Sequence, residues 1–309
     1  GQRGPKSHAE SKSTAKRLPS TQQGSSPPKR QRVGEPVGAG ERPAVPALDN
    51  LFRGSLSMAL RDAKYHLEQL TKDQKLLAKQ NAIVQVLLVL NQSTPLTQLR
   101  SRGVIPLMLK KMLMVGGHDN RLYCCAHVMV IAMLSVDPMD RRYISQAHAQ
   151  LLLMVLKKPI ATAAADKGKS CESLWKDLHS VLEAQFPRIA DLLSGGRTAE
   201  EFPMKEMALE ALRLVTEHND MLQDPFREMG GLEMLRDRMQ ASCRALKMSA
   251  DVLAPLRELE RVGRVLENLT FRNSQNVEQL VHNLELMDPM CEVIQFCKKQ
   301  LSEPCFEID

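Results

Sequence analysis

The sequence predicts an all-α fold, in which a stack of helical repeats follows a disordered N-terminal tail. Aromatic residues make up only 4% of the chain while Met alone occurs 17 times, and strands prefer aromatic and β-branched residues. Apolar residues recur at steps of three and four, as amphipathic helices require. One short phrase also occurs twice, as QLRSRGVIPLML at 98–109 and as PFREMGGLEMLR at 225–236.

Residues 1–48 are predicted to be a disordered tail, and residues 49–309 to be the repeat domain. The tail contains no aromatic residue and few large aliphatic ones, so it cannot bury enough surface to offset its ordering entropy. It also carries the whole net charge of +6, since residues 1–46 hold nine basic and three acidic residues. The remaining 33 basic and 33 acidic residues balance, which argues against direct DNA binding through phosphate contacts.

Two basic clusters in the tail resemble a two-part nuclear import signal. They consist of Lys16 and Arg17, and then of Lys29, Arg30 and Arg32. An import receptor needs an extended chain with separated cationic side chains, and the two prolines before the second cluster keep the chain extended. We expect import through this tail; a solvated tail without that role is the alternative.

The helical pattern begins near Leu51. Apolar residues at 56, 60, 63, 67 and 70 predict a first helix, and residues 75–90 a second. A short helix is expected to end at Gly103, and another to begin at Val104. The segment that starts at Asp119, DNRLYCCAHVMVIAMLSVD, is apolar on nearly all sides and should lie at the centre of the stack. Residues 157–170 predict a mobile loop, and Pro255 is expected to start or kink a long helix near the C-terminus.

The repeated phrase has the same context in both copies. A long apolar helix precedes it, and a short helix then ends at a glycine, Gly103 or Gly230, before another apolar helix. Such a glycine ends a helix in the left-handed conformation. Residues 262–294 form a fainter third copy. Each unit leaves apolar faces that only a neighbouring unit can cover, which predicts a HEAT- or armadillo-like solenoid. Coincidental helix stops in an ordinary helical domain are the alternative.

No arrangement of residues for catalysis or metal binding is found, so we expect neither an enzyme nor a cofactor. Cys124, Cys125 and His127 lie too close together on one helix to converge on a metal, and buried thiols are the simpler interpretation. The common hydrolase, metalloprotease and kinase motifs are absent. The longest apolar run is too short to cross a bilayer, so we expect no membrane partner.

Polar residues near the first copy of the phrase are the candidates for a partner-binding patch. They are Arg100, Arg102, His118, Asp119 and Arg121. Arginine is favoured at interfaces because its planar fork pairs with carboxylates at two points. The alternative is that Arg100 caps its own helix and that Asp119 is an N-cap.

Four stretches, in this order and spacing, resemble the conserved C-terminal domain of the Wapl (wings apart-like) family. They are LTQLRSRGVIPLMLKKM (96–112), RLYCCAHVMVIAMLSVD (121–137), KEMALEALRLVTEHNDMLQDPFREMGGLEML (205–235) and LERVGRVLENLTFRNSQN (259–276). The resemblance implies a helical-repeat protein that is not an enzyme and that releases cohesin from chromatin. It also implies a nuclear location and, as partners, the SMC and kleisin subunits of cohesin and its HEAT-repeat cofactor.

Two features depart from that family. Its longer members carry Phe-Gly-Phe motifs that engage cohesin and the cofactor, and no such motif occurs in this chain. The family domain usually continues through further repeats beyond the position of Asp309. A fragment of a longer protein, truncated at the C-terminus, or a divergent short member of the family would explain both departures. The alternative function is that of another armadillo-type nuclear adaptor or scaffold that binds extended peptides. The presence of one tryptophan, Trp175, weakens that alternative, because such grooves repeat Trp and Asn.

Overall fold

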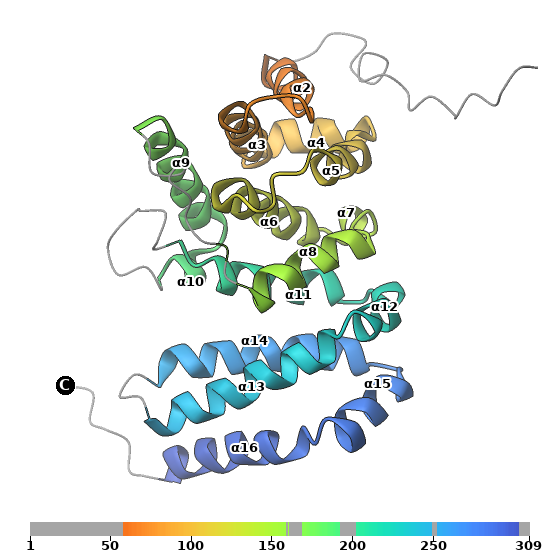
Figure 1. The fold of residues 1–309 in the computed structure, drawn as a ribbon, viewed down its shortest axis with the longest axis vertical. Coiled ribbons are helices and arrows are strands. Elements are labelled where there is room, and N and C mark those ends of the chain that lie inside the picture. Colours follow the sequence, from red (N-terminus) through yellow and green to blue (C-terminus); the bar gives the residue numbers. More distant parts are fainter. Residues whose placement is uncertain (1–57, 159, 161–168, 192–201, 249–251, 303–309) are drawn as a thin grey trace, which may run out of the picture. The chain divides into compact units, whose positions relative to one another are not determined.

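The structure is a computed structural model that describes residues 58–158, 160, 169–191, 202–248 and 252–302 (Figure 1). All of them belong to one unit, residues 45–309. The predicted import signal lies outside the described residues, as does most of the predicted loop at 157–170. Every regular element within the described residues is a helix, which confirms the predicted all-α class.

The helices follow one another as α2 (Met58–Gln69), α3 (Leu76–Leu90), α4 (Ser93–Ser101), α5 (Val104–Val115), α6 (Arg121–Ser135), α7 (Pro138–Arg141), α8 (Gln146–Lys157), α9 (Lys169–Gln185), α10 (Pro187–Ala190), α11 (Met204–Thr216), η2 (Asp220–Leu222), α12 (Gln223–Glu228), α13 (Gly231–Met248), α14 (Leu253–Thr270), α15 (Ser274–Glu278), η3 (Gln279–Asn283) and α16 (Met287–Ser302). Pro255 stands in the first turn of α14, where a proline starts a helix without breaking it.

Four groups of helices share a long–short–long order. They are α3–α4–α5, α6–α7–α8, α11–α12–α13 and α14–α15–α16. Their long helices stack, since α11 packs against α6, α8 and α14, and α3 packs against α2, α6 and α9. Within the unit, the short helices α7, α12 and α15 lie along one side, at the right in Figure 1. This arrangement confirms the predicted helical-repeat solenoid.

Helix α6 lies at the centre of the stack, as predicted. Every residue from Leu122 to Ser135 is buried, because α6 is covered by α3, α9 and α11. Its N-cap is Asn120, whose Oδ1 accepts from the Tyr123 N–H at 2.9 Å, so the expectation of Asp119 as the cap is wrong. Asn120 prevails because its Oδ1 also accepts from Gln80 of α3 at 3.0 Å inside the core, whereas Asp119 is exposed.

The two phrase glycines have the predicted left-handed backbone. The φ angles are 66° at Gly103 and 70° at Gly230, and each glycine separates a short helix from the long helix that follows. In the third copy Glu285 occupies the corresponding turn with φ 48°. The left-handed turn therefore recurs in the third copy even though glycine does not.

The two copies of the phrase differ in side-chain size at two positions that pack against each other. In the second copy, a Cβ added to Gly231 would lie 2.2 Å from Cε1 of the buried Phe226 ring. The first copy has Leu99 and Val104 at the matching positions, and both are buried. A larger side chain before the arginine thus requires a smaller one after the turn, because a close-packed core tolerates little added volume.

Candidate partner-binding surface

Arg100 is engaged within the chain. Its Nε donates to Asp140 Oδ2 at 2.5 Å, and its Nη2 lies 3.2 Å from Asp137 Oδ2. Both carboxylates belong to the start of α7, so Arg100 joins α4 to the next unit and does not cap its own helix. Burial raises the pKa of the Asp140 carboxyl, and the hydrogen bond and charge of Arg100 partly oppose that shift.

Arg121 and His118 are also engaged in internal contacts. The two terminal nitrogens of Arg121 donate to the carbonyl oxygens of Ile160 and Phe202, at 3.0 and 3.1 Å. His118 Nε2 lies 3.0 Å from Nδ1 of the buried His127. Arg121 therefore holds two distant segments in place, and replacing it would disturb the fold as well as a surface.

The five predicted residues do not form one patch. Arg100 meets the turn that follows the C-terminal end of α6, whereas Arg121 is the first residue of α6. The 15 residues of α6 separate these ends by ~22 Å at ~1.5 Å per residue. The expectation of one mixed-charge patch is therefore wrong, because a whole helix length lies between its halves. Arg102 is partly exposed and Asp119 is exposed, so these two remain accessible.

Arginines join successive units along the short-helix side. Arg100 pairs with Asp140 of α7, Arg141 of α7 pairs with Glu217 at the end of α11, and Arg227 of α12 donates to Asn276 Oδ1 of α15 at 2.6 Å. The receiving sites match in sequence as well. In α7 and α15 an N-cap Asp or Asn is followed three residues later by the Asp or Asn that accepts the arginine. The sequence repeat thus contains a repeated contact between units.

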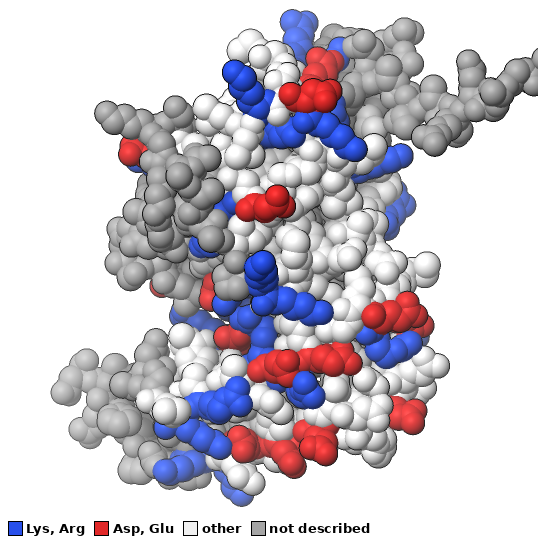
Figure 2. Space-filling model, viewed as in Figure 1, with Lys and Arg blue, Asp and Glu red and all other residues white. Residues whose placement is uncertain are grey.

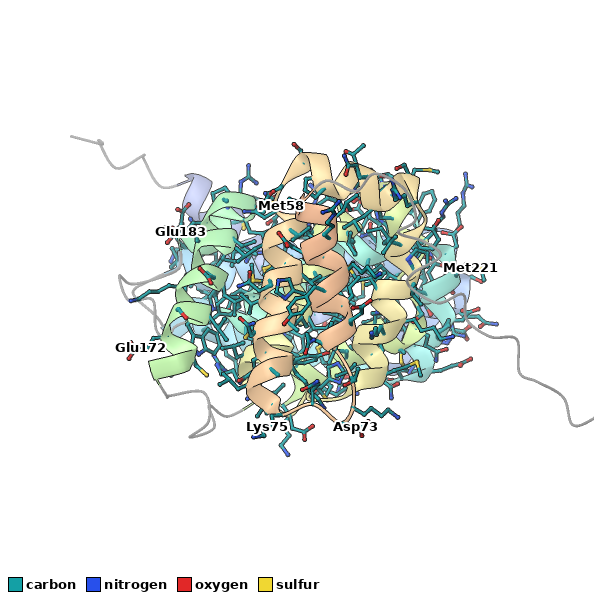
Figure 3. All side chains as sticks on the ribbon, turned by 90° about the horizontal axis from the view of Figure 1, so that it is seen from above. Met58, Asp73, Lys75, Glu172, Glu183 and Met221 are labelled. Carbon is teal, nitrogen blue, oxygen red and sulfur yellow. The ribbon has the colours of Figure 1, made fainter. Side chains whose placement is uncertain are left out.

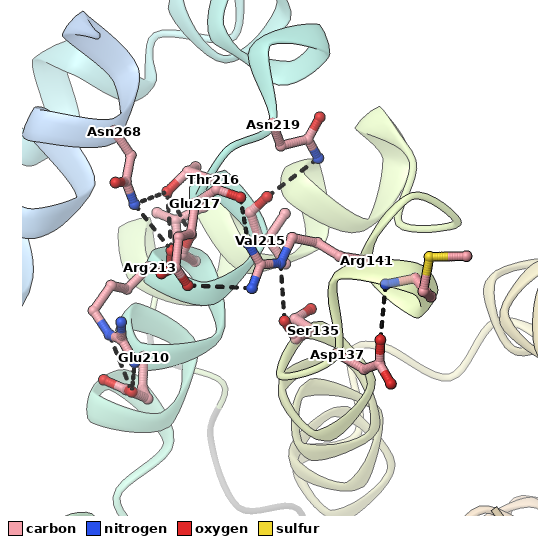
Figure 4. A network of polar contacts seen from close by, with 12 residues as sticks. Ser135, Asp137, Arg141, Glu210, Arg213, Val215, Thr216, Glu217, Asn219 and Asn268 are labelled. Atoms are coloured by element: carbon pink, nitrogen blue, oxygen red, sulfur yellow. Dashed lines mark hydrogen bonds and ion pairs between the residues drawn. The ribbon is translucent and has the colours of Figure 1, made fainter. Parts of the chain in front are cut away.

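Arg141 is the most buried member of this series (Figure 4). Its Nε donates to the Ser135 carbonyl at 2.9 Å, its Nη1 to the Glu217 carbonyl, and its Nη2 to Glu217 Oε2 at 3.2 Å. Ser135 ends α6 and Glu217 is the C-cap of α11. A cation at two helix C-termini satisfies carbonyls that lack helical partners and complements both helix dipoles. Arg141 therefore fastens the centre of the stack to the next unit.

A groove of about 650 Å³ opens beside this network, between the α9–α10 turn, α11 and α14. Its lining residues are Gln185, Phe186, Pro187, Arg188, Ile189, Glu210, Arg213, Glu217, His218, Glu260, Arg261, Arg264, Glu267 and Asn268. Glu210 is its central carboxylate, paired with Arg213 at 2.6 Å and with Arg261 at 3.3 Å. We call it the arginine groove.

A second groove of about 520 Å³ lies between α4 and the α6–α7 turn, and half of its lining residues are apolar, among them Leu96, Met133 and Val136. Gln185 lines both grooves, and its Nε2 donates to Asn91 Oδ1 at 2.7 Å. The two grooves therefore adjoin at the end of α9, and together they extend across several helical units.

Exposed apolar side chains occur at the start of the short-helix segments of three units. They are Val136, Met139, Met221 and Phe271, and we call this set the turn ridge. Met221 is 85% exposed, and Figure 3 places it on the side opposite Glu172 and Glu183 of α9. Elsewhere on the face in Figure 2, Lys and Arg are interleaved with Asp and Glu. An exposed apolar side chain therefore recurs at a similar place in three of the units.

The buried histidines and the buried Cys124 line neither groove. Burial lowers the pKa of His127 well below its ordinary value and that of His148 to about 4, so both are neutral near pH 7. Burial raises the pKa of the Cys124 thiol to about 12, which keeps it protonated and unreactive. Among the described residues, no group of three or more His, Cys, Asp or Glu could hold a metal ion. No helix in the same part of the chain is long and apolar enough to cross a membrane.

Comparison with known families agrees with this architecture. The family model described as "Wings apart-like protein regulation of heterochromatin" matches residues 53–306, which include all the described helices. A comparison with curated protein sequences finds no match. The match spans most of the chain and both copies of the repeated phrase. The chain therefore belongs to the Wapl family, whose description associates it with the regulation of heterochromatin.

Proposed function

We propose that this protein is a non-enzymatic regulator that binds cohesin and promotes its release from chromatin. The family match over residues 53–306 is the observation that supports this most directly. The partners proposed are the SMC and kleisin subunits of cohesin and its HEAT-repeat cofactor. A stack of helical repeats suits such a role, because it presents an extended surface on which partner proteins bind side by side.

We place the main contact with cohesin on the turn ridge. Its members lie at the start of the short-helix segments of three units, and each of them is at least 54% exposed. The central part of an interface is usually apolar, and the four ridge residues would supply that part. Arg102 is proposed as a flanking polar contact, and Asp119 as a separate contact at the opposite end of α6; Arg100, His118 and Arg121 act through the fold, given the internal contacts described above.

The protein is proposed to act in the nucleus, on chromatin. The family description, which refers to heterochromatin, supports this location. The two basic clusters of the tail, which lie outside the described residues, are proposed to bind an import receptor.

A second function, that of a nuclear adaptor which binds extended peptides, is favoured by one observation. The two adjoining grooves, of about 650 and 520 Å³, cross several units and could hold an extended chain. The two surfaces share Val136, which belongs to the turn ridge and also lines the second groove.

The test combines Met221→Asp with Phe271→Asp in the full chain. Both side chains are largely exposed, so the melting temperature should not change. We expect loss of co-precipitation with cohesin subunits from nuclear extract, and longer residence of fluorescent cohesin on chromatin after photobleaching. Met248→Asp, at an 88% exposed methionine at the end of α13, is the matched control and should behave as the parent. A parent chain that recovers no cohesin subunit would refute the proposed function; a double variant that still recovers them would refute only the ridge.

A further inference from the structure

A third groove, of about 260 Å³, lies between α13, α14, η3 and α16, at the lower end of the unit in Figure 1. Eight of its eleven lining residues are Met, Leu or Val, and Glu267 is the one charged residue among them. Three of the eight are Met239, Met287 and Met290, so we call it the methionine groove. The side chains of Val277, Met287 and Met290 are each at least 40% exposed. Apolar surface of the lining is therefore open to a partner.

The size and composition of the groove favour a protein helix as its occupant. Pockets for small molecules are typically ~300–1,000 Å³, more than this groove offers. Two of its lining residues, Gly263 and Thr270, are seven positions apart on α14, so the groove runs ~10 Å along that helix at ~1.5 Å per residue. Two apolar side chains one turn apart on a partner helix fit within that length. Methionine side chains are flexible and adapt to such groups, as in grooves that hold amphipathic helices.

Gly263 leaves room for another helix to approach α14 closely. A Cβ added there would meet no atom within 4 Å, although Gly263 lies in the interior of α14. Glycine is unfavourable inside a helix, and no packing within the described part of the chain requires it at this position. A missing side chain on the surface of a groove permits the close approach of a ligand.

Exposed carboxylates surround the apolar lining. Glu278, Glu285 and Asp288 each adjoin a lining residue in the sequence, are exposed, and make no ion pair with any described residue. The wall to which they belong, formed by α15, η3 and the first two turns of α16, contains no Lys or Arg. On α16, Glu292 is paired with Lys247 at 3.0 Å and adds no net charge. This wall therefore presents three unpaired negative charges.

The opposite wall does not compensate this charge. On α14, Glu260 and Glu267 share one guanidinium group, that of Arg264. Arg272 follows the groove residue Thr270 by two positions and is exposed. Together the two walls hold five carboxylates and two guanidinium groups, besides the paired Glu292. The rim of the methionine groove is thus acidic, and its charge is complementary to a basic partner.

Glu285 is retained at the rim against its backbone preference. Its φ of 48° lies in the left-handed region, where the other two copies of the phrase have glycine. Next to it is the π-helix η3, in which the Leu284 N–H donates to the Gln279 carbonyl at 3.0 Å. Short π-helical segments and left-handed residues other than glycine are both frequent at functional sites. This wall therefore combines two uncommon backbone features with a carboxylate.

We propose that the methionine groove binds a basic amphipathic helix of a partner protein. Two apolar side chains of that helix enter the groove between α14 and α16, and its Lys or Arg side chains lie beside Glu278, Glu285 and Asp288. The acidic rim disfavours nucleic acid and anionic membranes as occupants. It also disfavours residues 303–309 of the chain, which include three acidic residues and no basic one. The inference goes beyond the proposed function, since these residues differ from the turn ridge and the partner need not be cohesin.

The test is a display selection with the full chain as bait. The library consists of helical peptides with apolar residues at steps of three and four, and with Lys, Glu, Gln or Ala at the other positions. Peptides that also bind the Gly263→Leu protein are removed first, because this variant fills the groove floor and still carries the basic tail. Its melting temperature should not fall, since leucine is a better helix former than glycine and its Cβ meets open space; a fall would contradict the open floor.

We expect the remaining peptides to be enriched in Lys over Glu. In fluorescence anisotropy, a version of a selected peptide with Glu in place of each Lys should bind at least tenfold more weakly. A selection that leaves no peptide, or one in which Glu is as frequent as Lys, would overturn the proposal.

Two variants locate the contact on the protein. Glu278→Lys, at the exposed last residue of α15, should weaken binding of the selected peptide about fivefold, because a surface attraction becomes a repulsion. Glu285→Gly should weaken it about twofold and raise the melting temperature, since glycine suits the left-handed backbone. Glu228→Lys is the matched control: Glu228 is the exposed last residue of α12, outside the groove. Equal affinities for the Glu278→Lys and Glu228→Lys proteins would refute the site.

Discussion

Replacing Gly103 with Ala should destabilise the protein, while the same replacement at Gly263 should stabilise it. Gly103 has φ 66°, and a Cβ added there meets no atom within 4 Å, so the whole effect comes from the backbone. A left-handed conformation costs an L-residue ~1–2 kcal/mol, and the less flexible unfolded chain returns ~0.4–1 kcal/mol. The expected loss in free energy of unfolding is therefore about 1 kcal/mol for Ala, and more for the β-branched Val.

Gly263 is the matched control for Gly103. An added Cβ would meet no atom within 4 Å at either position, so the two sites differ only in backbone conformation. Gly263 lies within α14 and has no positive φ. Alanine is favoured over glycine in a helix interior by ~0.5–1 kcal/mol, so the sign should reverse. Denaturant unfolding followed by far-ultraviolet circular dichroism measures both variants. Shifts of the same sign would refute the claim that the phrase glycine is needed for its left-handed turn.

Three further predictions concern the packing, the pH dependence and the tail. Arg141→Met should lower the free energy of unfolding by about 2–3 kcal/mol, because the carbonyl groups of Ser135 and Glu217 at two helix ends lose their charged donor. Stability should fall as the pH drops from 6.5 towards 4: burial lowers the pKa of His148 to about 4, so the unfolded chain binds the proton first and up to ~3 kcal/mol is lost. Changing Lys29, Arg30 and Arg32 to Ala should move a large fluorescent fusion from the nucleus to the cytoplasm.

Each of these predictions has its own control. Arg264→Met, at the exposed groove rim, should cost less than about 1 kcal/mol, and a similar cost for Arg141→Met would contradict the buried-anchor account. His148→Gln should make the pH dependence shallower, because Gln still accepts from the Ser145 N–H but does not titrate in this range, while the lowered pKa of His127 leaves a remaining slope. An unchanged pH profile in that variant would exclude His148 as its source. Unchanged nuclear accumulation of the fusion would refute the import signal.

Much of the fold could be predicted because its signals are local. The left-handed turns at Gly103 and Gly230 follow from helix-stop chemistry, which acts within a few residues. The central place of α6 follows from its apolar surface on all sides. The N-cap was the exception: Asn120 prevailed over Asp119 because it also bonds to Gln80, which is 40 positions away and on another helix.

The candidate site could not be predicted in the same way. Arg100 and Arg227 looked like helix caps or surface contacts, and only the stacking of units brought them to Asp140 and Asn276. Arg121 bonds to carbonyl groups 39 and 81 positions away, so no window of sequence contains its partners. The arginine groove draws its lining from α10, α11 and α14, and nothing in the separate segments indicated that Arg188 and Arg261 would share it.

The sequence by itself determined the helical class, the repeating unit, the turns within it and the charge of the tail. These properties depend on interactions over three or four residues and on composition, which can be read directly from the residues. Only the tertiary structure decided which arginines join the units, which arginines line a groove, and where apolar side chains stay exposed. Those outcomes depend on which helix packs on which. They also depend on the length of α6, because this helix is ~22 Å long and keeps Arg100, near one end, apart from Arg121 at the other.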